Sequence, residues 1–386
     1  MADIIASLDP RTFLGLGEKR RAAVELGDGI IGEHSANRLA NELHPKTQYL
    51  FVKEIIKRSE DCNTYVLAPD GDRGTKRLAY FSAGQYLSVR IEIGGKIYNR
   101  PYSLCSSPRE ALDGSYSITV KAVEGGLVSN YILRSWSVGT SVEASQPLGN
   151  FTYEPLRDAG HIIGVAGGSG ITPFVSLAKA IADGDEDCSL TLISGFRDRS
   201  CVLFYDELIE ISKSCDRVRA VFVLSEDFAD GFEHGLITAD LIEKYANDAE
   251  YSIFVCGPQA LHSFINNEAK KIGIEEKYLR HELPGEAFLN EGEDRSITVT
   301  LIRNGEVIKA VGAANKSILR ILEEGGATPS AGCRSGECGF CRARLVLGEV
   351  FIPKETDRRR LADEKHRYIH PCCTYPKGDI TIEINE

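Results

Sequence analysis

Residues Cys333–Cys341 read CRSGECGFC, and Pro371–Thr374 read PCCT some thirty residues later. These two stretches hold five of the chain's 11 cysteines. Cys333, Cys338 and Cys341 have the spacing C-x4-C-x2-C, and Cys372 follows at a distance. Zinc sites usually combine C-x2-C pairs, whereas this spacing is typical of a [2Fe–2S] cluster. The sequence therefore predicts cluster ligands at Cys333, Cys338, Cys341 and Cys372.

Glycines surround these cysteines at positions that suit a loop wrapped around a cluster. Gly332, Gly336 and Gly339 leave room for backbone amides to approach the cluster sulfurs. Amide groups directed at sulfur stabilise the reduced cluster, which carries more negative charge. We therefore expect residues 332–341 to form a tight loop that bears three of the ligands.

Residues 296–386 resemble the plant-type ferredoxin family in two stretches, AGCRSGECGFCRARLVLGEV (Ala331–Val350) and CCTYPKGDITIEI (Cys372–Ile384). The family has a single cysteine where this chain has Cys372 and Cys373. Matching the residues TYP places the ligand at Cys372 and leaves Cys373 as a free thiol. A shift of the loop by one residue would exchange the two.

Length and charge limit the classes of protein that this chain can be. Its 386 residues allow two to four domains, and a formal net charge of −11 gives a nucleic-acid role no electrostatic support. No run of 18 apolar residues is present, and the start MADIIASLDPRTF lacks the regions of a signal peptide. We therefore expect a cytoplasmic protein without a membrane span, where clustered cysteines bind metal more often than they form disulfides.

The pattern of segments predicts a multidomain fold. Short β-rich segments with polar joins are typical of an antiparallel β-barrel, and alternating apolar strands and helices indicate an α/β domain with a parallel sheet. A hairpin is expected at Asn304–Gly305. The last segment has 14 Lys+Arg and 12 Asp+Glu, unlike the acidic remainder, which supports a boundary near residue 296. The predicted parts are a helical N-terminal extension (1–46), a flavin-binding β-barrel (47–153), an α/β nucleotide domain (154–284), a linker (285–295) and an α+β ferredoxin domain of the β-grasp type (296–386).

Two stretches of the barrel, RPYSLCSSP (Arg100–Pro108) and VKAVEGGLVSNYI (Val120–Ile132), resemble the ferredoxin–NADP reductase superfamily. The resemblance implies that Arg100 pairs with a flavin phosphate, that Tyr102 packs on the isoalloxazine ring, and that the Ser103 hydroxyl lies near the reactive ring nitrogen. It also implies pyrophosphate contacts at a helix N-terminus, which favour FAD over FMN. The residues implied in those contacts are Gly126, Val128 and Ser129.

The stretch GVAGGSGITPF (Gly164–Phe174) leaves a predicted strand and enters a predicted helix. Gly167, Gly168 and Gly170 allow a dinucleotide to approach the backbone closely. Thr172 is expected to cap the helix, with Pro173 at its first position. The superfamily resemblance assigns this loop to NADH or NADPH.

The same resemblance assigns CGP (Cys256–Pro258) to the nicotinamide side, so that Cys256, Gly257 and Pro258 join the candidate site. Arg197 and Arg199 could face the 2′-phosphate of NADPH. The nearby stretch LSEDFAD (Leu224–Asp230) is acidic and would repel that phosphate, which favours NADH.

The order of the three domains is similar to that of the phthalate dioxygenase reductase and phenylacetyl-CoA epoxidase reductase branches of the superfamily. This resemblance implies a reductase that passes electrons from NAD(P)H through FAD to the [2Fe–2S] cluster. A protein acceptor, such as an oxygenase or another metalloenzyme, would then take them. Ser103 and Cys256 are the candidate catalytic residues, and Glu282 and Phe288 in HELPGEAF could lie near the flavin.

Two other interpretations fit the same features. The chain could be the electron-transfer subunit of a larger redox complex, with residues 1–46 as a docking arm. It could also be a sensor that binds flavin and cluster without turnover, although the intact nucleotide loop and Cys256 argue against this.

Overall fold

The computed structural model describes residues 39–41, 43–246, 250–283 and 295–384. The chain divides into two compact units, Met1–Pro45 and Lys46–Glu386. Most of the predicted N-terminal extension, and the candidate Phe288, lie outside the described residues. Among the helices of the described ranges, none has the length and apolar character that crossing a bilayer requires. The helices and strands named below all belong to the second unit.

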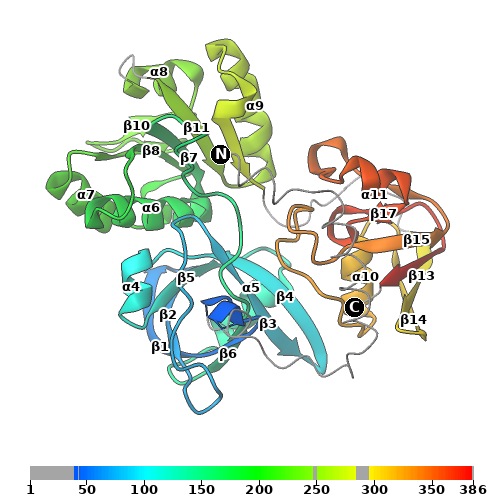
Figure 1. Cartoon of the computed structure of the whole chain (residues 1–386). Helices are drawn as coiled ribbons and strands as arrows, with labels where there is room; N and C mark the ends of the chain where they lie inside the picture. Colours follow the sequence, from blue (N-terminus) through cyan, green and yellow to red (C-terminus); the bar gives the residue numbers. More distant parts are fainter. Residues whose placement is uncertain (1–38, 42, 247–249, 284–294, 385–386) are drawn as a thin grey trace, which may run out of the picture. The chain divides into compact units, whose positions relative to one another are not determined.

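The first part of this unit is a six-stranded antiparallel sheet with the strand order β4-β3-β6-β1-β2-β5 (Figure 1). Leu104, directly after β4, bridges Ile118 in β5, so the two edge strands meet and the sheet curves into a barrel. Large apolar side chains such as Leu50, Tyr65 and Tyr116 fill its interior. The elements are β1 (Gln48–Ser59), β2 (Cys62–Pro69), β3 (Tyr86–Ile93), β4 (Lys96–Ser103), α4 (Pro108–Leu112), β5 (Tyr116–Lys121), α5 (Leu127–Ser135) and β6 (Ser141–Ala144).

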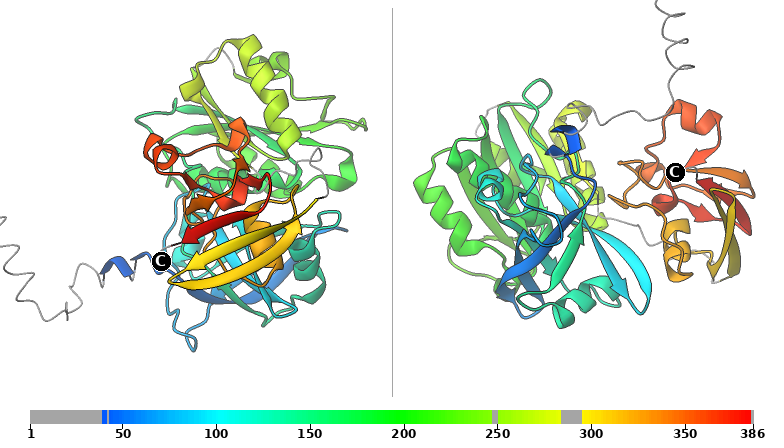
Figure 2. Two further views of the ribbon diagram at one scale, coloured as in Figure 1. Left: turned by 90° about the vertical axis from the view of Figure 1, so that its right-hand side faces the viewer. Right: turned by 60° about the horizontal axis from the view of Figure 1, so that its bottom comes forward.

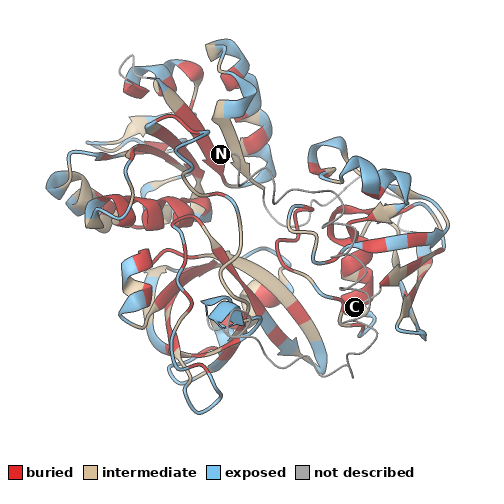
Figure 3. Ribbon diagram, viewed as in Figure 1, coloured by how far each residue is buried: buried red, intermediate tan, exposed pale blue. Residues whose placement is uncertain are grey.

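The second part is a six-stranded parallel sheet with the order β10-β9-β8-β7-β11-β12. Helices α6 and α7 share one apolar cluster with the sheet, and α8 and α9 share another, so helices cover both faces. Burial of both faces explains the continuous apolar strands; Figure 3 shows these strands as mostly buried. The elements are β7 (His161–Gly167), α6 (Thr172–Asp183), β8 (Ser189–Phe196), α7 (Tyr205–Ser214), β9 (Val218–Leu224), β10 (Glu233–His234), α8 (Ala239–Ala246), β11 (Tyr251–Cys256), α9 (Gln259–Ile272) and β12 (Leu279–Glu282), with short 3-10 turns η1 (Gly168–Ile171), η2 (Arg199–Cys201) and η3 (Glu276–Tyr278).

The predicted capping role of Thr172 is wrong. Thr172 has helical backbone angles, and the residue before it, Ile171, is the N-cap. Its hydroxyl donates a hydrogen bond to the Ser169 carbonyl at 3.0 Å instead of accepting one from the helix. The cause is the 3-10 turn η1, which runs directly into α6, so that no extended residue precedes the helix as a side-chain cap requires.

The third part is a five-stranded sheet with the order β14-β13-β19-β15-β17, in which β19 lies parallel to β13 (Figure 2, yellow and red strands). The expected hairpin is present, because Asn304 and Gly305 both have the positive φ that a tight two-residue turn requires. Helix α10 packs its apolar face on the sheet. The elements are β13 (Ser296–Arg303), β14 (Glu306–Ala313), α10 (Ile318–Glu324), β15 (Ala343–Leu347), β16 (Val350–Phe351), η4 (Lys354–Thr356), α11 (Leu361–Lys365), β17 (Tyr368–Ile369), η5 (Pro371–Cys373), β18 (Tyr375–Pro376) and β19 (Ile380–Ile384).

Candidate functional site

The four predicted ligand cysteines are brought together by the loop before β15 and by η5. The Cys333 sulfur accepts a hydrogen bond from the Cys338 backbone amide at 3.3 Å, and the Cys338 sulfur accepts one from the Cys333 amide at 3.3 Å. Side-chain hydrogen bonds from Cys338 and Cys372 lower the pKa of Cys333. A hydrogen bond with Cys372 likewise lowers the pKa of Cys341. The thiolate form, which binds metal, is thus favoured at two of these sulfurs.

The adjacent cysteines Cys372 and Cys373 have different neighbours. The Cys372 thiol donates hydrogen bonds to Cys333 and Cys341, two of the candidate ligands, and also to its neighbour Cys373. The Cys373 thiol lies 3.5 Å from the His370 carbonyl and 3.6 Å from the Thr356 carbonyl. A Cβ at Gly336, whose φ is +83°, would lie 2.7 Å from the Cys373 sulfur, so Cys373 packs behind the loop. These contacts support Cys372 as the fourth ligand.

The donor set suits an iron–sulfur cluster better than a zinc ion. A [2Fe–2S] cluster takes four cysteines over two irons, in the spacing C-x4-C-x2-C with a remote fourth cysteine. Cys333, Cys338, Cys341 and Cys372 have that number and spacing.

The three flavin candidates on β4 are Arg100, Tyr102 and Ser103, and each has a different environment. The Arg100 guanidinium group forms an ion pair with Glu323 of α10 at 3.3 Å. Burial raises the pKa of the Tyr102 hydroxyl. The Ser103 hydroxyl donates a hydrogen bond to a Glu282 carboxylate oxygen at 3.3 Å. The chain therefore presents a cation, an aromatic ring and a hydroxyl along one strand.

The remaining flavin candidates lie at the start of α5. Gly126 is the N-cap of this nine-residue helix, and no side chain caps the first turn. Val128 is buried in the barrel core, and a Cβ at Gly126 would lie 2.8 Å from the Ser129 hydroxyl. A helix start whose amides no side chain caps suits a phosphate group, as the prediction for FAD requires.

The nucleotide candidates lie at the carboxyl ends of β7 and β11. The strand order reverses between these two neighbours, and open α/β sheets bind their ligands at such a point. Gly167 ends β7, and Gly168 has a φ of +55°. A Cβ at Gly170 would lie 2.3 Å from the Cys256 carbonyl oxygen, so only glycine lets the two turns pack this closely. Gly257 is packed against Gly167 in the same place.

Glu282 connects the flavin and nucleotide candidates. Its carboxylate accepts hydrogen bonds from the Ser103 hydroxyl at 3.3 Å and from the Cys256 thiol at 3.2 Å. Burial raises the pKa of Glu282 to about 7. Burial and the nearby Glu282 also raise the pKa of Cys256, so this thiol stays protonated. Ser103 and Cys256, the two candidate catalytic residues, thus share one carboxyl group.

Sequence reasoning named Glu282 without giving it a role. The missing signal is strand β12, which pairs in register with β11 so that Glu282 lies opposite Cys256. The four residues of β12 show no alternation of buried and exposed positions, and all are half-buried. An interpretation of residues 279–282 as a further parallel strand would have placed Glu282 beside Cys256.

A histidine pair supports the turn that follows β11. His262 of α9 is buried, and its Nε2 lies 3.1 Å from the Gly257 carbonyl oxygen. Its Nδ1 lies 2.9 Å from Nδ1 of His281, the residue before Glu282. Burial lowers the pKa of both rings, that of His281 to about 4, so both are neutral near pH 7. The pair therefore ties the candidate nicotinamide turn to β12.

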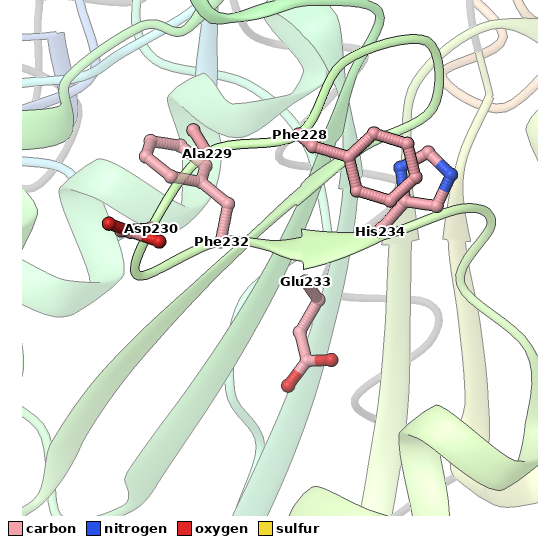
Figure 4. A pocket seen from close by; sticks show the side chains of 6 residues that line it. All are labelled: Phe228, Ala229, Asp230, Phe232, Glu233 and His234. Carbon is pink, nitrogen blue, oxygen red and sulfur yellow. The ribbon is translucent and has the colours of Figure 1, made fainter.

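Arg197 lies at the carboxyl end of the neighbouring strand β8. Its side chain is 63% exposed and forms ion pairs with Asp198 at 3.2 Å and Glu226 at 3.9 Å. Beyond β9, a surface pocket of about 360 Å³ is lined by residues 228–230 and 232–234 (Figure 4). In it the Phe228 and His234 rings stack with centroids 3.6 Å apart.

Three domain families match the chain. Residues 49–153 match an oxidoreductase FAD-binding domain, and residues 165–267 match an oxidoreductase NAD-binding domain. Residues 301–377 match a 2Fe-2S iron-sulfur cluster binding domain. The three matches cover the barrel, the parallel sheet and the cysteine-bearing sheet in turn.

Full-length relatives have the same organisation. The ferredoxin reductase component of 3-ketosteroid-9-alpha-monooxygenase from Rhodococcus rhodochrous is 30% identical over 348 residues, which are 86% of this chain and 94% of the relative. A component of the 1,2-phenylacetyl-CoA epoxidase from Escherichia coli is 27% identical, covering 79% of this chain and 89% of the relative. The solved structure of phthalate dioxygenase reductase, described as modular for electron transfer from pyridine nucleotides to [2Fe-2S], is 28% identical. It matches with a TM-score of 0.64 over 88% of this chain and 98% of that one.

These matches agree with the geometry. The donor set at the cysteines, the uncapped start of α5 and the glycine turns at the sheet's reversal point suit the three groups that the family uses. NAD(P)H, FAD and a [2Fe–2S] cluster are therefore the electron carriers of this oxidoreductase. The chain belongs to the ferredoxin–NADP reductase family, in the group of flavoprotein reductases that carry a C-terminal [2Fe–2S] ferredoxin domain.

Proposed function

We propose that this chain is the reductase that supplies electrons to an oxygenase. The observation that carries the proposal is the contact of Glu282 with both Ser103 and Cys256, because it joins the flavin strand to the nicotinamide turn. The relatives named above belong to a monooxygenase, an epoxidase and a dioxygenase system, which supports an oxygenase as acceptor. We also propose that the chain acts in the cytoplasm.

The bound groups supply the redox chemistry: a hydride brings two electrons to the flavin, and the cluster passes them on one at a time. We assign the protein's part to three sets of residues. One set binds FAD, one holds the nucleotide, and one ligates the cluster. They are Arg100, Tyr102, Ser103, Gly126, Val128 and Ser129 for FAD; Gly167, Gly168, Gly170, Thr172, Arg197, Cys256, Gly257 and Pro258 for the nucleotide; and Cys333, Cys338, Cys341 and Cys372 for the cluster.

Glu282 has a defined task in this proposal. Hydride transfer leaves a positive charge on the nicotinamide ring, and an ionised carboxylate beside the ring favours that charge. The raised pKa of about 7 means that Glu282 changes its charge in the working pH range. The hydroxyl of Ser103 and the thiol of Cys256 hold the carboxylate in place beside the expected nicotinamide site.

We further propose that NADH is the preferred donor. Arg197, a candidate partner of the 2′-phosphate, is already paired with Asp198 and Glu226. Asp230 and Glu233 line the pocket beyond β9 (Figure 4); Glu233 is paired with Lys244 at 2.6 Å, and Asp230 adds to the repulsion of a phosphate. An unmodified ribose carries no such charge and is not repelled.

An anaerobic absorption titration of the purified protein tests the proposal. NADH is expected to bleach the flavin bands and then the broad cluster absorption, and NADPH is expected to do so much more slowly. Added oxygenase candidates should then reoxidise the cluster. A flavin-plus-cluster spectrum that neither nucleotide bleaches would refute the reductase role and favour the sensor or the subunit of a larger complex.

A further inference from the structure

A buried carboxylate in α10 connects the cluster loop to the flavin-binding strand. The Glu323 side chain is 1% exposed and lies between two guanidinium groups. One oxygen accepts from Arg334 at 2.8 Å, and the other accepts from Arg100 at 3.3 Å. Arg334 follows the ligand Cys333 directly, and Arg100 lies on β4 three residues before Ser103.

The backbone of β4 completes this contact. The Asn99 carbonyl oxygen accepts hydrogen bonds from Arg100 at 2.8 Å and from Arg334 at 3.3 Å. Because Arg334 is only 2% exposed, its charge would be costly to bury without Glu323. The ion pair between Arg334 and Glu323, within the ferredoxin domain, would by itself balance the buried charge. The additional bond of Glu323 to Arg100 of the barrel therefore calls for a separate explanation.

Other contacts link the same two regions. The Lys96 ammonium group donates to the Glu324 backbone carbonyl. The Ser88 hydroxyl donates to the Ala331 carbonyl at 3.3 Å, next to the cluster loop. Leu148 lies 3.7 Å from the position that a Cβ of Gly332 would take. The hairpin of β3 and β4 therefore contacts both α10 and the start of the cysteine loop, and Glu323 and Arg334 are the buried charged groups at these contacts.

We propose that Glu323 is a positioning residue for electron transfer from flavin to cluster. By holding Arg334 and Arg100 at once, its carboxylate fixes the ligand loop against the strand that carries the flavin contacts. The step itself moves one electron from the reduced flavin to the cluster, and no bond forms or breaks. Its rate falls as the distance between the two groups grows, so a cluster loop that is held less closely to β4 slows the transfer.

The test compares Glu323→Gln with Glu324→Gln in the full-length protein loaded with FAD and cluster. Glu324 is the matched control, because it is half-exposed and pairs with Lys316 at 2.5 Å and Arg320 at 2.9 Å inside its own domain. One equivalent of NADH is mixed in anaerobically, and the bleaching of flavin and of cluster is followed separately in time. Flavin content, iron content and thermal stability are measured on the same samples.

In E323Q, flavin reduction should stay within about twofold of wild type, whereas cluster reduction slows by about tenfold or more. E324Q should leave both rates unchanged. Cluster reduction in E323Q within twofold of wild type refutes the proposal. A fall of both rates together, with lost flavin or iron, identifies a merely structural role and refutes it as well.

A second variant tests the reach of the side chain separately from its charge. Glu323→Asp keeps the charge but is too short to reach both guanidinium groups, so it should slow cluster reduction by a smaller factor. A rate equal to that of wild type would overturn the proposal. The inference rests on the proposed order of electron transfer, from flavin to cluster. If NADH never reduced the cluster of the wild-type protein, that order would be refuted, and not the role of Glu323 alone.

Discussion

Replacing Glu282 by glutamine should change the stability of the protein in a way that depends on pH. The pKa of this carboxyl group is about 7 in the folded protein and 4.5 ordinarily. As pH rises, the unfolded chain loses this proton first, so the stabilising contribution of protonated Glu282 is complete below pH 4.5 and is lost between 4.5 and 7. The difference between the folded and the ordinary pKa corresponds to roughly 3 kcal/mol of unfolding free energy. Glutamine mimics the protonated form at every pH.

Wild type and E282Q are therefore expected to melt together at pH 4.5, and E282Q should melt higher at pH 8.5. For the unit Lys46–Glu386, with an unfolding entropy of about 2.1 cal/mol/K per residue, roughly 3 kcal/mol corresponds to about 4 °C. Calorimetry at both pH values gives the difference, and Glu226→Gln, which removes an exposed carboxylate of the same sheet domain, serves as control. A gain of the same size at both pH values, or a loss at pH 8.5, would show that the carboxylate is not buried as described.

The kinetic counterpart uses the same variant. Flavin reduction by NADH should accelerate as pH rises through 7, because the ionised carboxylate favours the charge that develops on the nicotinamide ring. In E282Q the rate should be lower and independent of pH in this range. A wild-type profile without a step near pH 7 would contradict the assigned role.

Three further predictions follow from the site. Cys372→Ser should lose the cluster, seen as lost iron and lost cluster absorption, whereas Cys373→Ser should keep it. The reverse result would mean that Cys373, not Cys372, is the fourth ligand. Glu226→Gln should raise kcat/KM for NADPH by about fivefold, or about 1 kcal/mol of relieved repulsion, with little change for NADH; equal changes for both donors would argue against a charge effect. Gly170→Ala should abolish flavin reduction by NADH, because its Cβ would lie 2.3 Å from the Cys256 carbonyl oxygen, while dithionite should still reduce flavin and cluster. Normal reduction by NADH would mean that the two turns can separate.

Local sequence patterns were enough for much of this molecule. The cysteine spacing, the Asn304–Gly305 turn and the change from short β segments to alternating strands and helices each have a short-range physical cause. A two-residue turn needs positive φ, and a parallel sheet needs crossover helices. The fold class and the cluster ligands could therefore be predicted without knowledge of which distant segments touch, whereas FAD and NAD(P)H were implied by the resemblance to the ferredoxin–NADP reductase superfamily.

What the sequence could not reveal depends on contacts between distant segments. Glu282 becomes a neighbour of Cys256 only because β12 adds to the edge of the sheet, and four half-buried residues show no pattern of their own. Arg100 could be predicted to meet a phosphate from its own strand, but Glu323 lies 223 positions away. The predicted capping role of Thr172 was wrong for a local reason, since the sequence of the 3-10 turn before it looks like that of any glycine-rich loop.

The central place of β19 in the ferredoxin sheet affects the order in which the protein can mature during synthesis. This strand lies between β13 and β15, yet it is made after all four ligand cysteines. From Cys341 to Ile384 there are 43 further residues to translate, which take roughly 2–9 s at typical ribosome speeds. During that interval the barrel and the parallel sheet can already fold and bind their groups, while three thiols wait in a domain whose sheet is open. Iron loading should therefore be the last step of maturation and the one most exposed to oxidants, so a shortage of cluster supply would yield a flavin-loaded, cluster-free reductase.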